Sequence, residues 1–88
     1  MVRSKDFIKR KIATQYVIVA VGAATKRFNG MVSVNETGSF IWDALENDIS
    51  MDELVARMTE NYEVDAETAR AHAIEFLNVL KGVGAIAE

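Results

Sequence analysis

The sequence of 88 residues lacks cysteine and proline and contains one histidine, His72. Without cysteine the chain has no disulfides, no thiolate metal ligands and no thiol nucleophile. One histidine excludes a histidine-rich metal site within a single copy. We therefore expect no metal and no cofactor, and the missing cysteines fit a reducing cytoplasm.

Long hydrophobic runs are also missing. The apolar stretch 12–24 is too short to span a bilayer, and Thr14 and Gln15 interrupt it. It follows a basic run as the core of a signal peptide would, but its valine, isoleucine and tyrosine residues favour strands. We expect two strands connected at Thr14 and Gln15, with a signal peptide as the alternative, and no membrane association.

The composition fits one folded domain over residues 1–88. Half of the residues (50%) are hydrophobic and 26% are charged, which is typical of globular chains and not of disordered ones. A chain this short rarely divides into two domains. Because a domain of this size buries only about two thirds of its unfolded surface, a partner strand or a second copy would add stability.

The net charge of −3 conceals an asymmetry along the chain. Residues 1–30 carry seven basic side chains and one acidic side chain, whereas residues 31–88 carry three basic and twelve acidic side chains. This pattern indicates oriented association with a charged partner. The alternative is a basic hairpin that packs beside acidic helices of the same fold.

The first part of the chain has the pattern of β-strands. Residues 7–13 and 16–22 are rich in β-branched and aromatic residues, and residues 31–34 form a short third run. A connection over residues 22–30 precedes the third strand, and its last pair, Asn29-Gly30, is typical of a hairpin turn.

After residue 35 the apolar residues recur with the spacing of an α-helix. Asn35, Ser50 and Asp65 are each placed to cap a helix, and Ser50 with Glu53 forms a capping box. The apolar residues of each segment fall on one helical face. The glycines Gly82 and Gly84 are expected to end the third helix. Three short strands followed by three helices predict an α+β fold, arranged like a winged helix-turn-helix.

Several short motifs occur in an order that resembles the PqqD family over about residues 28–86. They are Val34-Asn35-Glu36-Thr37, Phe40-Ile41-Trp42, Leu45, Met51–Leu54, Asn61-Tyr62-Glu63-Val64-Asp65, Phe76-Leu77, Leu80 and Gly84. The resemblance implies a recognition element for ribosomally made precursor peptides. The leader of such a peptide is expected to pair with the third strand, in a groove bordered by the third helix, and a radical S-adenosylmethionine enzyme is the expected partner.

One position departs from the family pattern. The family often has an acidic residue where this chain has His72. If that acid orients the leader, the ligand here differs, which puts pyrroloquinoline quinone synthesis itself in doubt.

The residues also point to peptide binding without the family. An edge strand presents unpaired N–H and C=O groups, and a short uncharged edge does not repel an incoming strand. We therefore predict peptide binding by Met31, Val32, Ser33 and Val34, with His72, Phe76 and Val79 of the third helix as the opposite wall. The alternative is that Phe76 and Val79 are core residues, as we expect for Trp42.

The basic run Lys9, Arg10 and Lys11 has two interpretations. It attracts an acidic leader or an acidic enzyme surface, or it is a solvated strand.

Other functions fit the sequence less well. A helix-turn-helix that binds DNA needs a basic face, but the third helix balances Glu67 and Glu75 against Arg70 and Lys81. An enzyme needs a nucleophile and base, a phosphate loop or a metal cluster, and none is visible. A homodimer through the exposed edge strand is the remaining alternative.

Overall fold

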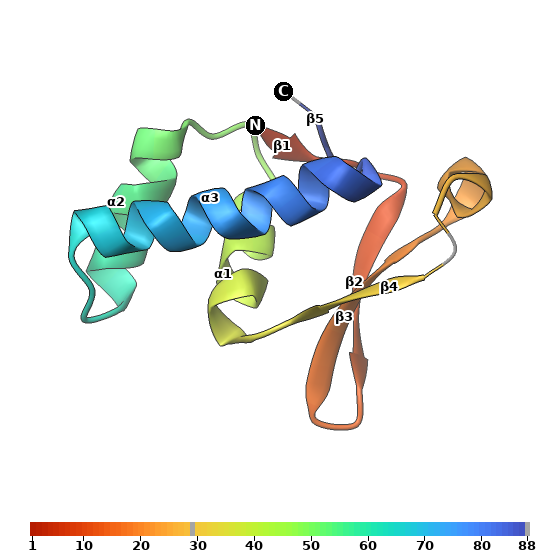
Figure 1. Ribbon diagram of the computed structural model, residues 1–88, viewed down its shortest axis with the longest axis horizontal. Coiled ribbons are helices and arrows are strands. Elements are labelled where there is room, and N and C mark those ends of the chain that lie inside the picture. The colour runs from red at the N-terminus through yellow and green to blue at the C-terminus, as the bar shows by residue number, and fades with distance from the viewer. Residues whose placement is uncertain (29, 88) are drawn as a thin grey trace.

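A computed structural model describes residues 1–28 and 30–87, so the predicted turn residue Asn29 lies outside the described residues. The three longer strands precede the three α-helices (Figure 1): β2 (Phe7–Ile12), β3 (Gln15–Ala20), β4 (Met31–Val34), α1 (Glu36–Ala44), α2 (Met51–Asn61) and α3 (Ala66–Val83). The predicted α+β fold is therefore confirmed. The winged helix-turn-helix arrangement of these elements stays a prediction.

The three strands form an antiparallel sheet in the order β2-β3-β4. Ile12 pairs with Gln15, so the hairpin turn consists of Ala13 and Thr14. Our prediction placed this connection one residue too late, at Thr14 and Gln15. Ala13 has φ +57°, the left-handed conformation that tight two-residue hairpin loops require. Sequence reasoning overlooked it because alanine rarely adopts this conformation.

Three short elements were not predicted. The two-residue strands β1 (Val2–Arg3) and β5 (Ile86–Ala87) pair with each other and bring the two ends of the described chain together. A 3-10 helix, Gly22–Lys26, occupies part of the expected connection before β4. Pieces this short carry no periodic signal, and β1–β5 pairing depends on contacts distant in sequence.

The helix boundaries follow the predicted caps. Asn35, Ser50 and Asp65 each accept a hydrogen bond from the amide three residues later, at 2.8, 3.1 and 2.7 Å respectively. The backbone hydrogen bond at Asp65 lowers the pKa of its carboxyl group. Gly84 ends α3 with φ +79°, which confirms the predicted stop.

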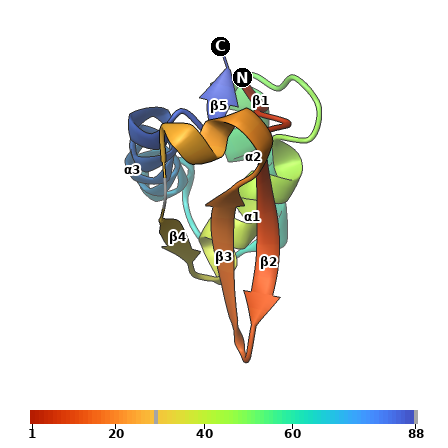
Figure 2. The ribbon, with the colours of Figure 1, turned by 90° about the vertical axis from the view of Figure 1, so that its right-hand side faces the viewer.

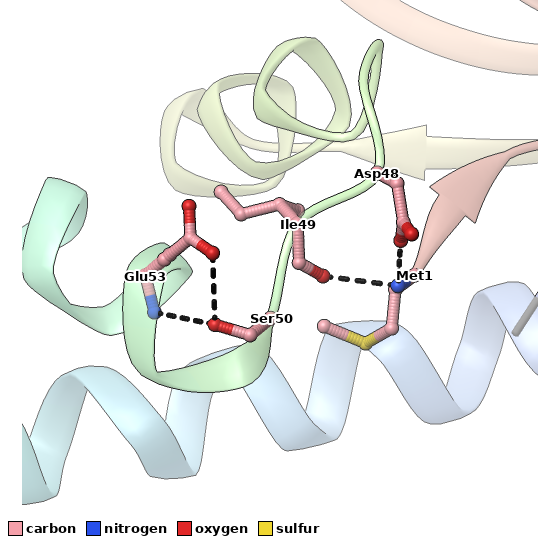
Figure 3. A network of polar contacts seen from close by, with 5 residues as sticks. All are labelled: Met1, Asp48, Ile49, Ser50 and Glu53. Carbon is pink, nitrogen blue, oxygen red and sulfur yellow. Dashed lines mark hydrogen bonds and ion pairs between the residues drawn. The ribbon is translucent and has the colours of Figure 1, made fainter.

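The loop between α1 and α2 also holds the first residue of the chain (Figure 3). The amino group of Met1 donates to Asp48 Oδ1 at 2.7 Å and to the carbonyl of Ile49 at 2.9 Å. The hydrogen bond from the Met1 amino group and the positive charge of that group lower the pKa of Asp48. Directly after Ile49, the Ser50 hydroxyl donates to Glu53 Oε1 at 3.3 Å, so Glu53 contacts the hydroxyl of the cap, whereas a capping box pairs this carboxylate with the backbone N–H of the cap.

The core lies between one side of the sheet and the helices. Its largest fully buried side chains are Trp42, Ile18, Ile41, Leu45, Leu54, Met58, Leu77 and Leu80. Trp42 is 1% exposed, which confirms its predicted core position, and the Arg3 guanidinium lies 5.6 Å from its ring centroid. Within the described residues, no helix combines the length and apolarity needed to cross a membrane.

Candidate functional site

Strand β4 forms one edge of the sheet. In the described residues it pairs with β3 on one side, and the sheet ends at β4 on the other side. Figure 2 shows β4 at the margin of the sheet, on the same side of the molecule as α3. The predicted edge strand Met31–Val34 is therefore present with the predicted bounds and with one side open.

One hydrogen bond at the open end of the β2–β3 hairpin shows which backbone N–H and C=O groups of β3 face β2 and which face β4. The Val21 N–H donates to the Asp6 carbonyl at 2.7 Å, one position beyond the Phe7–Ala20 pair. Hydrogen-bonded and non-bonded pairs alternate along an antiparallel ladder. The odd-numbered residues of β3 therefore direct their backbone groups toward β2, and the even-numbered residues direct theirs toward β4.

The same alternation defines the open edge. Val32 and Val34 lie opposite the even-numbered residues of β3, so their N–H and C=O groups are used within the sheet. The N–H and C=O groups of Met31 and Ser33 point outward from the edge. Of the four predicted backbone positions, Met31 and Ser33 thus offer hydrogen bonds, whereas Val32 and Val34 anchor the strand.

A pocket of about 280 Å³ lies between the start of α1 and the middle of α3, directly after β4. Its lining residues are Asn35, Thr37, Gly38, Ile41, His72, Glu75, Phe76 and Val79. The three predicted wall residues of α3 therefore meet in one pocket. Val79 is 45% exposed, so the alternative that it is a core residue is wrong, while the half-buried Phe76 also packs against the core.

The other lining residues were not predicted as site residues. A Cβ atom at Gly38 would lie 3.2 Å from Phe76 Cε1 and 3.3 Å from Asn35 Oδ1, so glycine permits the close approach of α1 to α3. Only the folded structure shows this contact. Glu75 had a usable signal, because it lies three residues after His72 and four before Val79, on one helical face.

A second, more open depression of about 720 Å³ lies near the hairpin tip. It is lined by Thr14, Gln15, Tyr16, Ser33, Val34, Asn35, Glu36 and Ser39. Both hollows therefore border the end of β4.

The structure separates the three basic residues of β2. Lys9 Nζ contacts Asp43 Oδ1 at 2.8 Å and Ser39 Oγ at 2.7 Å, so its charge is paired with α1. Lys11 lies over the Tyr16 ring, 5.9 Å from its centroid. In the part of the chain that the structure describes, Arg10 and Lys11 have no carboxylate partner. The predicted electrostatic role is thereby confined to these two residues, and it stays a prediction.

The sequence and the structure of the chain were both compared with those of known proteins. The family model for coenzyme PQQ synthesis protein D (PqqD) matches residues 15–86. A solved structure, TbiB1 in complex with the TbiA(beta) leader peptide, is 22% identical, with a TM-score of 0.76 and full coverage of both chains. This likeness shows a shared fold, and a comparison with curated proteins gave no match. Because the matched residues include β3, β4 and all three helices, the chain belongs to the PqqD family.

Proposed function

We propose that the chain binds the leader segment of a ribosomally made precursor peptide and presents it to a modifying enzyme. The observation that carries this proposal is the open edge of β4 directly beside a pocket on α3. The fold shared with TbiB1, which was solved with a leader peptide, supports it. An added peptide strand draws affinity from main-chain hydrogen bonds and selectivity from pockets for alternate side chains.

The outward backbone groups specify how such a strand would pair. The N–H and C=O groups of Met31 and Ser33 bond to one peptide residue each, or to neighbouring residues if the strands run parallel. Peptide side chains then alternate between the helix side of the sheet and the opposite side. Those on the helix side lie over the pocket between α1 and α3.

The pocket favours an apolar peptide side chain. Ile41, Phe76 and Val79 supply apolar surface, whereas His72 and Glu75 supply polar groups. A pocket with this mixture buries one aliphatic or aromatic side chain and selects its orientation through the polar groups. We propose His72 as the residue that gives this member a ligand preference of its own.

We propose that the chain is not catalytic and that its partner, a radical S-adenosylmethionine enzyme in the cytoplasm, supplies the chemistry. In residues 1–28 and 30–87, no group of three potential metal ligands lies together. A nucleic-acid role has little support from α3, because Arg70 is paired with Asp52 Oδ1 at 2.6 Å. The helix therefore offers few free cations to phosphates.

Amide hydrogen exchange tests the proposal. The probe is a synthetic peptide with the leader sequence of a candidate precursor, chosen from short reading frames that neighbour the gene for this chain. Its addition should slow exchange at Met31 and Ser33, whose N–H groups face outward, while Val32 and Val34 are already protected within the sheet. Unchanged exchange at Met31 and Ser33 with saturating peptide would rule out strand addition at β4.

The same edge also suits pairing with a second copy of the chain, since exposed edges invite association. Sedimentation over a range of concentrations separates the two functions. A monomer whose Met31 and Ser33 amides exchange freely until peptide is added supports recognition. A dimer that protects these amides without peptide contradicts it.

A further inference from the structure

The side of the sheet that faces away from the helices is unusually apolar. Because Lys9 reaches Asp43 on α1, the residues in register with Lys9 face the helices, and the alternate residues face outward. We call this second set the outer face. It consists of Ile8, Arg10, Ile12, Gln15, Val17, Val19, Met31 and Ser33, and none of its apolar members belongs to the main core.

Two rows of side chains cross the outer face. Ile8, Val19 and Met31 lie opposite one another on the three strands, and Ile8 is 37% and Met31 is 61% exposed. Figure 2 shows β2 and β3 in front of α1, with α3 to one side, next to β4. A contiguous exposed apolar surface that is bordered by polar residues is typical of an interaction site.

The second row contains the charge. Arg10, Val17 and Ser33 lie opposite one another, and Arg10 is the only charged residue at the outward strand positions. The described residues place no carboxylate in contact with it. Val17 lies outside the core cluster and is only 5% exposed, so it adds little accessible apolar surface to this row.

This charge argues against a second copy as the occupant. Two copies related by a two-fold axis present the same surface to each other, so packing of two outer faces would bring two Arg10 side chains into one apolar interface. Burying like charges without carboxylates is strongly unfavourable. A protein surface that is apolar and carries a carboxylate satisfies both the apolar row and Arg10.

We infer that the outer face is the docking surface for the peptide-modifying enzyme, through an apolar patch that carries a carboxylate opposite Arg10. This inference rests on the proposed function. A leader strand added beside β4 extends both rows, so its outward side chains lie next to Met31 and Ser33. The enzyme therefore contacts the chain and its bound leader on one continuous surface, and it binds the loaded form more tightly than the free form.

Binding measurements with outer-face variants test the inference. The probe is the purified enzyme that modifies the precursor whose leader this chain binds, and its affinity is measured with and without leader peptide. Ile8→Asp and Arg10→Glu should each weaken enzyme binding by about tenfold or more. Each variant places a carboxylate against an enzyme surface that is apolar and itself carries a carboxylate. The matched control is Ile74→Asp on α3, which changes an apolar side chain that is 45% exposed but does not belong to the outer face, and it should leave enzyme affinity unchanged.

Measuring leader affinity distinguishes a failure of the docking surface from a failure of the proposed leader binding. Ile8→Asp should retain wild-type leader affinity and a wild-type far-ultraviolet circular dichroism spectrum, and Ile12→Asp provides a second outer-face variant nearer the hairpin tip. Enzyme binding unaffected by Ile8→Asp, Ile12→Asp and Arg10→Glu overturns the docking surface, even if the leader still binds. A wild-type dimer that Ile8→Asp dissociates also overturns it, since the second copy is then the occupant. Absence of leader binding by the wild type refutes the proposed function instead.

Discussion

The two edge strands of one sheet differ in how they meet solvent. Strand β2 places Lys9, Arg10 and Lys11 in succession, whereas β4 contains no charged residue. Charged side chains, lysine above all, discourage the addition of a foreign strand to an exposed edge. The same fold thus protects one edge and leaves the other open to pairing.

The surroundings of the two edges differ as well. Beside β4, the chain turns into α1 through the Asn35 cap, and α3 supplies the wall of the pocket. An open edge alone gives main-chain hydrogen bonds to any extended segment, but a neighbouring pocket makes the edge selective. We therefore expect leader recognition to depend on both the uncharged strand β4 and the neighbouring helix α3.

The largest effect is expected from proline at the two edges. Ser33→Pro removes an outward N–H and should weaken leader binding by about tenfold to a hundredfold, because an unpaired buried acceptor costs about 1–3 kcal/mol. Lys11→Pro is the matched control, since its N–H also points outward, but from β2. Leader affinity by fluorescence anisotropy and thermal midpoints measure both variants. Equal losses of affinity at the two edges would contradict the assignment to β4.

The sequence predicted those parts of the molecule that depend on local signals. Asn35, Ser50 and Asp65 cap the helices because each needs only its own amide neighbours. The bounds of β4 were also predictable, because a short apolar run lies between a turn signal and a cap.

Features that depend on distant contacts were not predictable. The β1–β5 pairing joins the two ends of the described chain, and no local pattern encodes it. Glycine at position 38 matters only because the Phe76 ring of α3 lies next to it in the folded chain. The outward direction of Ser33 required the hairpin register, which the predicted turn placed one residue too late.

A smaller effect is expected from narrowing the pocket beside β4. In Gly38→Ala the new methyl group would lie 3.2 Å from Phe76 Cε1, so the ring has to shift and the pocket that both residues line changes shape. Leader affinity should fall about tenfold, which corresponds to about 1.4 kcal/mol. Alanine in a helix gains about 1 kcal/mol over glycine, so overall stability is largely kept.

The control for this change is Gly82→Ala on α3, where an added Cβ meets nothing within 4 Å. It should raise the thermal midpoint through helix propensity and leave leader affinity unchanged. Calorimetric titration of both variants compares them directly. If Gly38→Ala binds the leader as tightly as the wild type does, the pocket is not part of the site.

Removing apolar surface from the pocket should have a milder effect. Val79→Ser replaces a pocket residue that is 45% exposed, and Ile74→Ser replaces an equally exposed residue of the same helix outside the pocket. Partial burial of a valine against the leader contributes about 1 kcal/mol, so Val79→Ser should weaken binding by about fivefold. Ile74→Ser should leave the dissociation constant unchanged, and a matching loss there would indicate a general effect on α3.

The smallest effect is expected from the charges that protect β2. Arg10 and Lys11 have no carboxylate partner in the described residues, so we expect them to attract an acidic leader at long range. Raising the salt concentration from about 0.05 to 0.5 M shortens the screening length and should slow association about two- to threefold with little change in dissociation. Lys11→Gln should reduce this salt dependence, whereas Lys81→Gln at the end of α3 should preserve it. Stopped-flow association rates measure the difference, and a salt-independent rate for the wild type would exclude electrostatic attraction of the leader by these charges.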